Sequence, residues 1–164
     1  MDGYNRKKIM LMIIERATTL DAKEILALQK LAYISEAEIY NDFTIQPLHQ
    51  TLNEIASEIN MRYVLKCVVN DRIVGSVRAY ITERTCFICK LIVHPKFQNQ
   101  GIGTKLLKEI ENHFNRAKRF ELFTGHKSEK NLHLYQKQGF EIFKSEKVNE
   151  ALTLVFMEKN KGIA

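Results

Sequence analysis

The segment 85–93 restricts the fold of this chain most, because it is apolar on both faces that a strand would present. The apolar residues of one face are Phe87, Cys89, Leu91 and Val93, and those of the other are Cys86, Ile88 and Ile92. A strand with two apolar faces belongs in the middle of a sheet that is covered on both sides. Pro95 ends this strand, since proline cannot continue a central ladder.

Hydrophobic periodicity predicts the other elements. A period of two predicts strands over 10–17, 63–69, 72–81, 120–124, 140–143 and 152–157. Helical spacing predicts helices that begin at Asp21 and Pro47, joined by a polar connection over 35–46, and further helices over 101–115 and 128–138. Hairpins mixed with helical crossovers predict an α/β (α+β) fold, in which a mixed central sheet has helices on both faces.

Length and cysteine content set the class of protein. A chain of 164 residues has the size of one compact domain, so we expect a single domain over 1–164. Its three cysteines are an odd number in a chain long enough to fold without disulfides, which favours a cytoplasmic setting.

Cys86 and Cys89 have the spacing of half a zinc site, but they would point to opposite faces of a strand, so no metal is expected. The apolar run 9–14 is too short for the core of a secretion signal or for a membrane span.

The segment 93–105 combines the end of the central strand, a short loop and the start of a strongly amphipathic helix. Gly101 and Gly103 stand in the first turn of that helix. The first N–H groups of a helix lack intrahelical partners, and glycine lets a bulky anion approach them. We therefore expect a phosphate or pyrophosphate site. The loop fits neither a P-loop nor a dinucleotide fingerprint, and a purely structural use of both glycines, for close helix packing, stays open.

Two motifs give this chain a resemblance to a known family. The segment Gln98-Asn99-Gln100-Gly101-Ile102-Gly103 resembles the Q/R-x-x-G-x-G/A motif of the GNAT superfamily of acyl-CoA N-acyltransferases. The segment 131–140 resembles that family's later helix, with its ending L-Y-x-x-x-G-F, and the two motifs stand in the expected order. The resemblance covers essentially the whole chain. It implies a mostly antiparallel sheet of about seven strands, with splayed fourth and fifth strands.

The resemblance implies an N-acetyltransferase that uses acetyl-CoA and releases coenzyme A. In the family, the loop binds the coenzyme pyrophosphate, the fourth strand pairs with the pantetheine arm, and a tyrosine, matched here by Tyr135, gives its proton to the leaving thiolate. The N–H of Ile92 or Val93 is expected to stabilise the oxyanion. The residues expected to bind the coenzyme are Leu91, Ile92, Val93, Gln98, Asn99, Gln100, Gly101, Ile102, Gly103, Thr104 and Asn131.

The acceptor is expected to be a primary amine of a small molecule or peptide, which attacks directly in a ternary complex. Glu36, Tyr40 and Asp42 are the expected substrate-binding residues, because acidic groups beside aromatic rings attract a cationic amine. The segment 85–93 contains no Asp or Glu where many relatives carry a general base. The base stays open between an ordered water and four carboxylates, namely Glu36, Glu38, Asp42 and Glu83.

Three other functions compete with this interpretation. The formal net charge of +6 suggests nucleic-acid binding, but the basic residues are spread along the chain rather than gathered on one element, so nucleic acid is not an expected partner. An acetyltransferase acting on an RNA-borne amine fits both charge and fold. A catalytically silent acyl-CoA sensor is the third alternative. A homodimer is compatible with the sequence.

Overall fold

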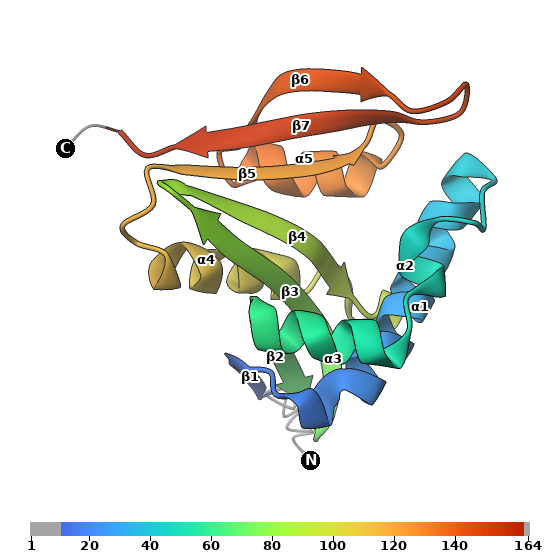
Figure 1. Ribbon diagram of the computed structural model, residues 1–164, viewed down its shortest axis with the longest axis vertical. Coiled ribbons are helices and arrows are strands. Elements are labelled where there is room, and N and C mark those ends of the chain that lie inside the picture. The colour runs from blue at the N-terminus through green and yellow to red at the C-terminus, as the bar shows by residue number, and fades with distance from the viewer. Residues whose placement is uncertain (1–10, 163–164) are drawn as a thin grey trace, which may run out of the picture.

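The computed structural model describes residues 11–162, and a seven-stranded mixed sheet organises them (Figure 1). The strands are β1 (Met12–Arg16), β2 (Tyr63–Val69), β3 (Arg72–Thr82), β4 (Thr85–Val93), β5 (Arg119–Gly125), β6 (Glu141–Lys147) and β7 (Thr153–Asn160). The helices are α1 (Ala22–Tyr40), α2 (Gln46–His49), α3 (Leu52–Met61), α4 (Ile102–His113) and α5 (Glu129–Lys137). The predicted fold class is confirmed, and Met10 of the first expected strand lies outside the described residues.

The centre of the sheet is β4, as its two apolar faces predict. The strand order is β1-β2-β3-β4-β5-β7-β6, and all neighbours are antiparallel except β4 and β5. The parallel pair is short, because only Thr85–Phe87 of β4 faces Arg119–Glu121 of β5. Beyond these residues the two strands diverge, as Figure 1 shows. The expected splay of the fourth and fifth strands is therefore confirmed.

Two apolar cores lie on the two faces of the sheet. One contains Ile102, Leu106 and Ile110 of α4 together with residues of α5, β5 and β7. The other contains Ile25 of α1 and Ile55 of α3. Helices therefore cover both faces, as predicted. Among residues 11–162, no helix has both the length and the apolarity that a membrane span requires.

A bulge in β4 changes which face its side chains reach. Lys90 has a φ of 49°, and the pairing of β3 with β4 shifts beside it. Cys86 and Ile88, before the bulge, belong to the core under α4, whereas Ile92, after it, belongs to the core under α1 and α3. The prediction that these three residues share one face is therefore wrong, since a bulge inserts one residue and reverses the alternation.

The first two predicted helices differ from the structure in their limits. The first continues as α1 to Tyr40, because Ala37 and Tyr40 extend its buried face, and Asn41 ends it in the left-handed conformation. Glu36 and Tyr40 are thus helical, not part of a connection. The second divides into α2 and α3, since Thr51 starts α3 with a capping box formed with Glu54.

Candidate functional site

The first turn of α4 presents unused backbone donors. Gly101 is the N-cap residue, with a φ of 81°, and no atom lies within 4 Å of the position that its Cβ would take. The first backbone bond of the helix runs from the N–H of Lys105 to the carbonyl of Gly101, at 3.0 Å. Within the described part of the chain, the N–H groups of residues 99–104 have no acceptor. These donors, at the positive end of the helix dipole, suit an anion.

The two glycines of this turn serve different purposes. Gly101 adopts a conformation that favours glycine, and the space beside it is open. A Cβ on Gly103, in contrast, would lie 3.1 Å from Cδ2 of Leu134 in α5. Close helix packing therefore explains Gly103, whereas Gly101 provides the backbone turn and the access that an anion needs.

A groove of about 930 Å³ runs from this turn into the splay between β4 and β5 and on to α1. Of the residues predicted to bind the coenzyme, it is lined by Leu91, Ile92, Val93, Gln98, Asn99, Gly101, Ile102, Gly103, Thr104 and Asn131. Gln100 is exposed and does not line it. The structure thus gathers nearly all of the expected coenzyme residues around one groove.

Tyr135 has its ring in the core and its hydroxyl at the groove. Its side chain is 5% exposed, and its ring centroid lies 6.1 Å from that of Phe140. Every fully enclosed polar side-chain atom of the described residues has a partner. Since the Tyr135 hydroxyl makes no hydrogen bond there, it opens onto the groove that the residue lines. Burial, together with nearby Tyr33 and Glu36, raises the pKa of Tyr135, so the phenol stays protonated.

Glu36 is fixed beside Tyr135 by a chain of hydrogen bonds. The Ser128 hydroxyl donates to Oε2 of Glu36 at 2.6 Å and accepts from the Tyr40 hydroxyl at 2.9 Å. The N–H of Lys127 donates to the same Tyr40 oxygen at 3.0 Å. Ser128 is 2% exposed and Tyr40 is 7% exposed, so the bond between their hydroxyls is shielded from water. It connects the C-terminal turn of α1 to the β5–α5 turn and holds one wall of the groove.

The four carboxylates that the sequence left as candidate general bases differ in whether they reach the groove. Glu36 lines the groove, as does Glu129 at the exposed start of α5. Asp42 lies outside the groove and accepts from the N–H and hydroxyl of Thr44, at 2.8 and 2.6 Å. Glu38 is exposed on α1, and Glu83 is exposed in the β3–β4 turn. Of the expected substrate-binding residues, Glu36 and Tyr40 therefore reach the groove and Asp42 does not.

Tyr33 is a groove residue that the sequence analysis missed. It lies one helical turn before Glu36 on α1, and both side chains line the groove. Burial raises the pKa of Tyr33, while the charge of Arg78 opposes this shift and the charge of Glu36 adds to it. The signal was the three-residue spacing of Tyr33 and Glu36. The sequence analysis placed a connection over 35–46, which ended the predicted helix between Tyr33 and Glu36 and so hid their helical spacing.

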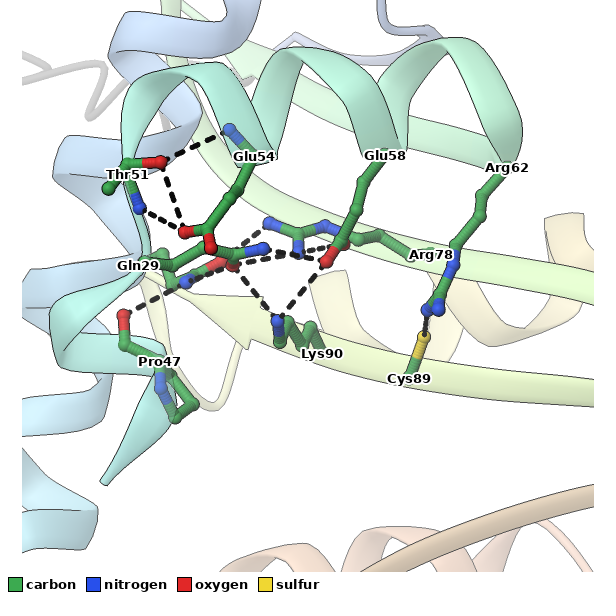
Figure 2. Close-up of polar contacts among 10 residues, drawn as sticks. Gln29, Pro47, Thr51, Glu54, Glu58, Arg62, Arg78, Cys89 and Lys90 are labelled. Carbon is green, nitrogen blue, oxygen red and sulfur yellow. Dashed lines mark hydrogen bonds and ion pairs between the residues drawn. The ribbon is translucent and has the colours of Figure 1, made fainter.

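A polar cluster around Arg78 lies between α3 and the sheet (Figure 2), and its member Lys90 also lines the groove. Arg78, 1% exposed, donates to Oε2 of Glu58 and to Oε1 of Gln29, both at 2.5 Å. Oε1 of Gln50 accepts from Arg78 at 3.3 Å and from Nζ of Lys90 at 2.9 Å. The sequence analysis missed this cluster, because its members are far apart in the chain.

The two neighbouring cysteines point to different faces of β4. Cys86 is fully buried in the core under α4, and burial raises the pKa of its thiol to about 12. Cys89 lies on the α3 side, where Nη1 of Arg62 donates to its sulfur at 3.2 Å (Figure 2). The prediction of opposite faces is confirmed.

One family model and one curated relative are similar to this chain in sequence. The family model described as acetyltransferase (GNAT) domain matches residues 31–161. The UPF0157 protein YqkA of Bacillus subtilis (strain 168) is 30% identical over 146 residues, which are 88% of this chain. This chain spans 42% of the length of that relative.

Solved structures of acetyltransferases are similar in fold to this chain over almost its whole length. The PaiA N-acetyltransferase of Thermoplasma acidophilum, in complex with coenzyme A, is 16% identical, with a TM-score of 0.78 over 93% of this chain and 100% of that one. The ribosomal-protein-S18-alanine N-acetyltransferase of Escherichia coli is 14% identical, with a TM-score of 0.76 over 94% of this chain and 96% of that one. Both likenesses concern the fold.

Proposed function

Since the chain belongs to the GNAT acetyltransferase family, we propose that it transfers an acetyl group from acetyl-CoA to a primary amine of a small molecule or peptide. The amine attacks directly while both substrates are bound. The observation that carries this proposal is the groove, which joins unused N–H groups of α4 to a half-buried carboxylate, Glu36, and a protonated phenol, Tyr135. The proposed setting is the cytoplasm.

The α4 turn and the free edge of β4 bind the coenzyme. The open space at Gly101 fits a diphosphate, which accepts from the N–H groups of residues 99–104 and from the Thr104 hydroxyl. Beyond Phe87, β4 pairs with no strand of residues 11–162 on its β5 side, so its backbone groups there can pair with the amide-containing pantetheine arm. The coenzyme A complex of the similar Thermoplasma enzyme supports this choice of ligand.

Glu36 prepares the amine. Its carboxylate attracts the ammonium form into the groove and takes the proton that the amine must lose. The Ser128 hydroxyl holds Oε2, which leaves Oε1 for this contact. Glu36 is the carboxylate named from the sequence that reaches the groove, which supports it over Glu38, Asp42 and Glu83.

The remaining groups act on the thioester, which supplies the carbonyl carbon that the amine attacks and the thiolate that leaves. The N–H of Ile92 or Val93 stabilises charge on the carbonyl oxygen, a contribution of about 3 kcal/mol for one well-placed donor. Tyr135 gives its proton to the sulfur as the carbon–sulfur bond breaks. Glu36 releases the ammonium proton to solvent, and the second proton, which the nitrogen loses after attack, replaces the one given by Tyr135. The products are therefore an amide, a free thiol and one released proton.

Thiol release from acetyl-CoA tests the proposal. The purified protein is incubated with acetyl-CoA and a panel of small amines and peptides, and free thiol is measured with and without each amine. Amine-dependent release supports the proposal. Coenzyme binding without release for any amine overturns it in favour of a silent acyl-CoA sensor. Release that requires an RNA-borne amine supports the alternative acceptor.

A further inference from the structure

The polar cluster beside the groove carries more positive than negative charge. Lys90 lies within electrostatic reach of two further cations, Arg62 and Arg78. Among the described side chains, Glu58 is the one carboxylate that forms an ion pair with Arg78 and Lys90 (Figure 2). The nearby Glu54 is fully exposed and is bound to Thr51 in the capping box. A half-buried excess of positive charge is costly unless an anion compensates for it.

Two of the three cations are already engaged. Arg78 is enclosed and bonded to Glu58, Gln29 and Gln50. Arg62 donates to Cys89 and lies over the Tyr80 ring, 4.9 Å from its centroid. Neither presents a free charge to the groove.

Lys90 is the cation of this cluster whose charge is least compensated. Its nearest partner, at 2.9 Å, is the neutral amide oxygen of Gln50, and Oε1 of Glu58 lies 3.7 Å away while Oε2 binds Arg78. Lys90 lines the groove, whereas Arg62, Arg78 and Glu58 do not. Burial and the charge of Arg78 lower the pKa of Lys90, as expected for a cation that lacks a full counter-charge.

Tyr33 connects this positive wall to Glu36. Its hydroxyl is within electrostatic reach of both Arg78 and Glu36, and Tyr33 lines the groove together with Glu36 and Lys90. The groove therefore offers a carboxylate, that of Glu36, for an ammonium group and an ammonium, that of Lys90, for an anionic group.

We infer that the acceptor is an amine that also carries an anionic group, a carboxylate as in an amino acid or a phosphate, and that Lys90 binds this group while Glu36 binds the amine. This inference rests on the proposed function and names its substrate class. The bulge in β4 is what directs Lys90 to this wall, since Lys90 itself adopts the left-handed conformation there. Lys90 is then a specificity-determining residue.

Matched acceptors test the inference. The kcat/KM for thiol release is measured with amino acids and their neutral carboxamides, and with phosphoethanolamine and ethanolamine. At least one anionic member is expected to exceed its neutral partner by about tenfold or more, as for a charged hydrogen bond. The pair that shows the preference identifies carboxylate or phosphate. Equal values within both pairs overturn the inference, although thiol release would still support the proposed function.

Variants of Lys90 complete the test. Lys90→Met should reduce the ratio of anionic to neutral kcat/KM to about 1, mainly through KM, and Lys90→Arg should keep most of the preference. Lys108→Met, an exposed control on α4 outside the groove, should retain the wild-type ratio. A Lys90→Met variant that lowers both values equally overturns the inference.

A binding measurement separates the two proposals. With coenzyme A bound, the wild-type protein should bind the preferred anionic amine in calorimetry, and Lys90→Met should bind it about tenfold more weakly. Equal binding by both proteins overturns the inference. If no amine yields thiol, the proposed function fails, whereas this readout still decides whether Lys90 binds the anion.

Discussion

The hydroxyl of Tyr40 fills the space that a side chain at Gly125 would need. A Cβ at position 125 would lie 2.5 Å from Cζ of Tyr40 and closer still to its oxygen, so only glycine lets α1 approach the end of β5 this closely. The same oxygen bonds to Ser128 and to the backbone of Lys127. The position of the groove wall that contains Glu36 therefore depends on glycine, which has no side chain, at position 125.

Gly125→Ala should lower the free energy of unfolding by about 1–3 kcal/mol, the usual cost of overpacking a tight site. Urea unfolding followed by circular dichroism measures this change. Gly162→Ala is the matched control, since a Cβ there meets no atom within 4 Å and should leave stability unchanged. Equal unfolding midpoints for the two variants would contradict the close approach of Tyr40.

Gly101→Asp should weaken coenzyme A binding at least about tenfold more than Gly101→Asn does, because a carboxylate repels the diphosphate at this helix end. The two variants form a matched pair, since Asp and Asn have similar shapes and both tolerate a φ of 81° better than most residues. Isothermal calorimetry gives the two dissociation constants. If they agree, the diphosphate binds elsewhere.

Tyr135→Phe should reduce kcat about 100-fold, at the lower end of what a general acid contributes, with little change in coenzyme affinity. The phenol hydroxyl is removed, while the ring that packs in the core remains. Steady-state thiol release and calorimetry measure the two quantities. Tyr80→Phe, on an exposed ring outside the groove, should change neither. A loss of affinity with unchanged kcat would remove Tyr135 from the acid role.

Asp21 should stabilise the fold at neutral pH and lose this effect in acid. Burial would raise its pKa, but the N–H of Thr18 at 2.8 Å and the Lys66 ammonium at 2.9 Å outweigh burial and lower the pKa below its usual 3.8. A lowered pKa means that the ionised form contributes stability above pH 3.8 and that this contribution disappears as the pH falls through the folded pKa.

Urea unfolding of wild type and Asp21→Asn at pH 7 and pH 3 measures this effect. The difference in unfolding free energy should be largest at pH 7 and smaller at pH 3. Asp71→Asn, in the exposed β2–β3 turn, is the control and should show no comparable change with pH. A difference for Asp21→Asn that does not depend on pH would refute the contribution of the charge.

Local sequence patterns predicted the parts of the molecule that local interactions determine. The apolar stripe of Ile102, Leu106 and Ile110 identified α4, and the Asn70-Asp71 pair identified a hairpin turn in which both residues have positive φ. Gly101 identified the start of α4. In each case a period or a backbone preference within a few residues decides the structure.

Long-range contacts determine what the sequence did not reveal. Arg78 is hydrogen-bonded to Gln29, 49 positions away in the sequence, and to Glu58, 20 positions away. No local periodicity therefore predicts the cluster. The bulge at Lys90 depends on how β3 and β4 pair, and α1 continues to Tyr40 because that ring packs at the distant Gly125 and Ser128. The groove residues Tyr33, Glu36 and Lys90 depend on such long-range contacts.

The short pairing of β4 with β5 leaves an opening in the sheet that the proposed donor would complete. Three residue pairs hold the two halves of the sheet together, and the edge that opens beyond them has the form of a vacant strand position. Under the proposed function, a pantetheine chain paired there would act as that strand and would bridge the halves. On this view the loaded protein is mechanically more continuous than the free one, and donor binding itself builds the surface against which the amine is received.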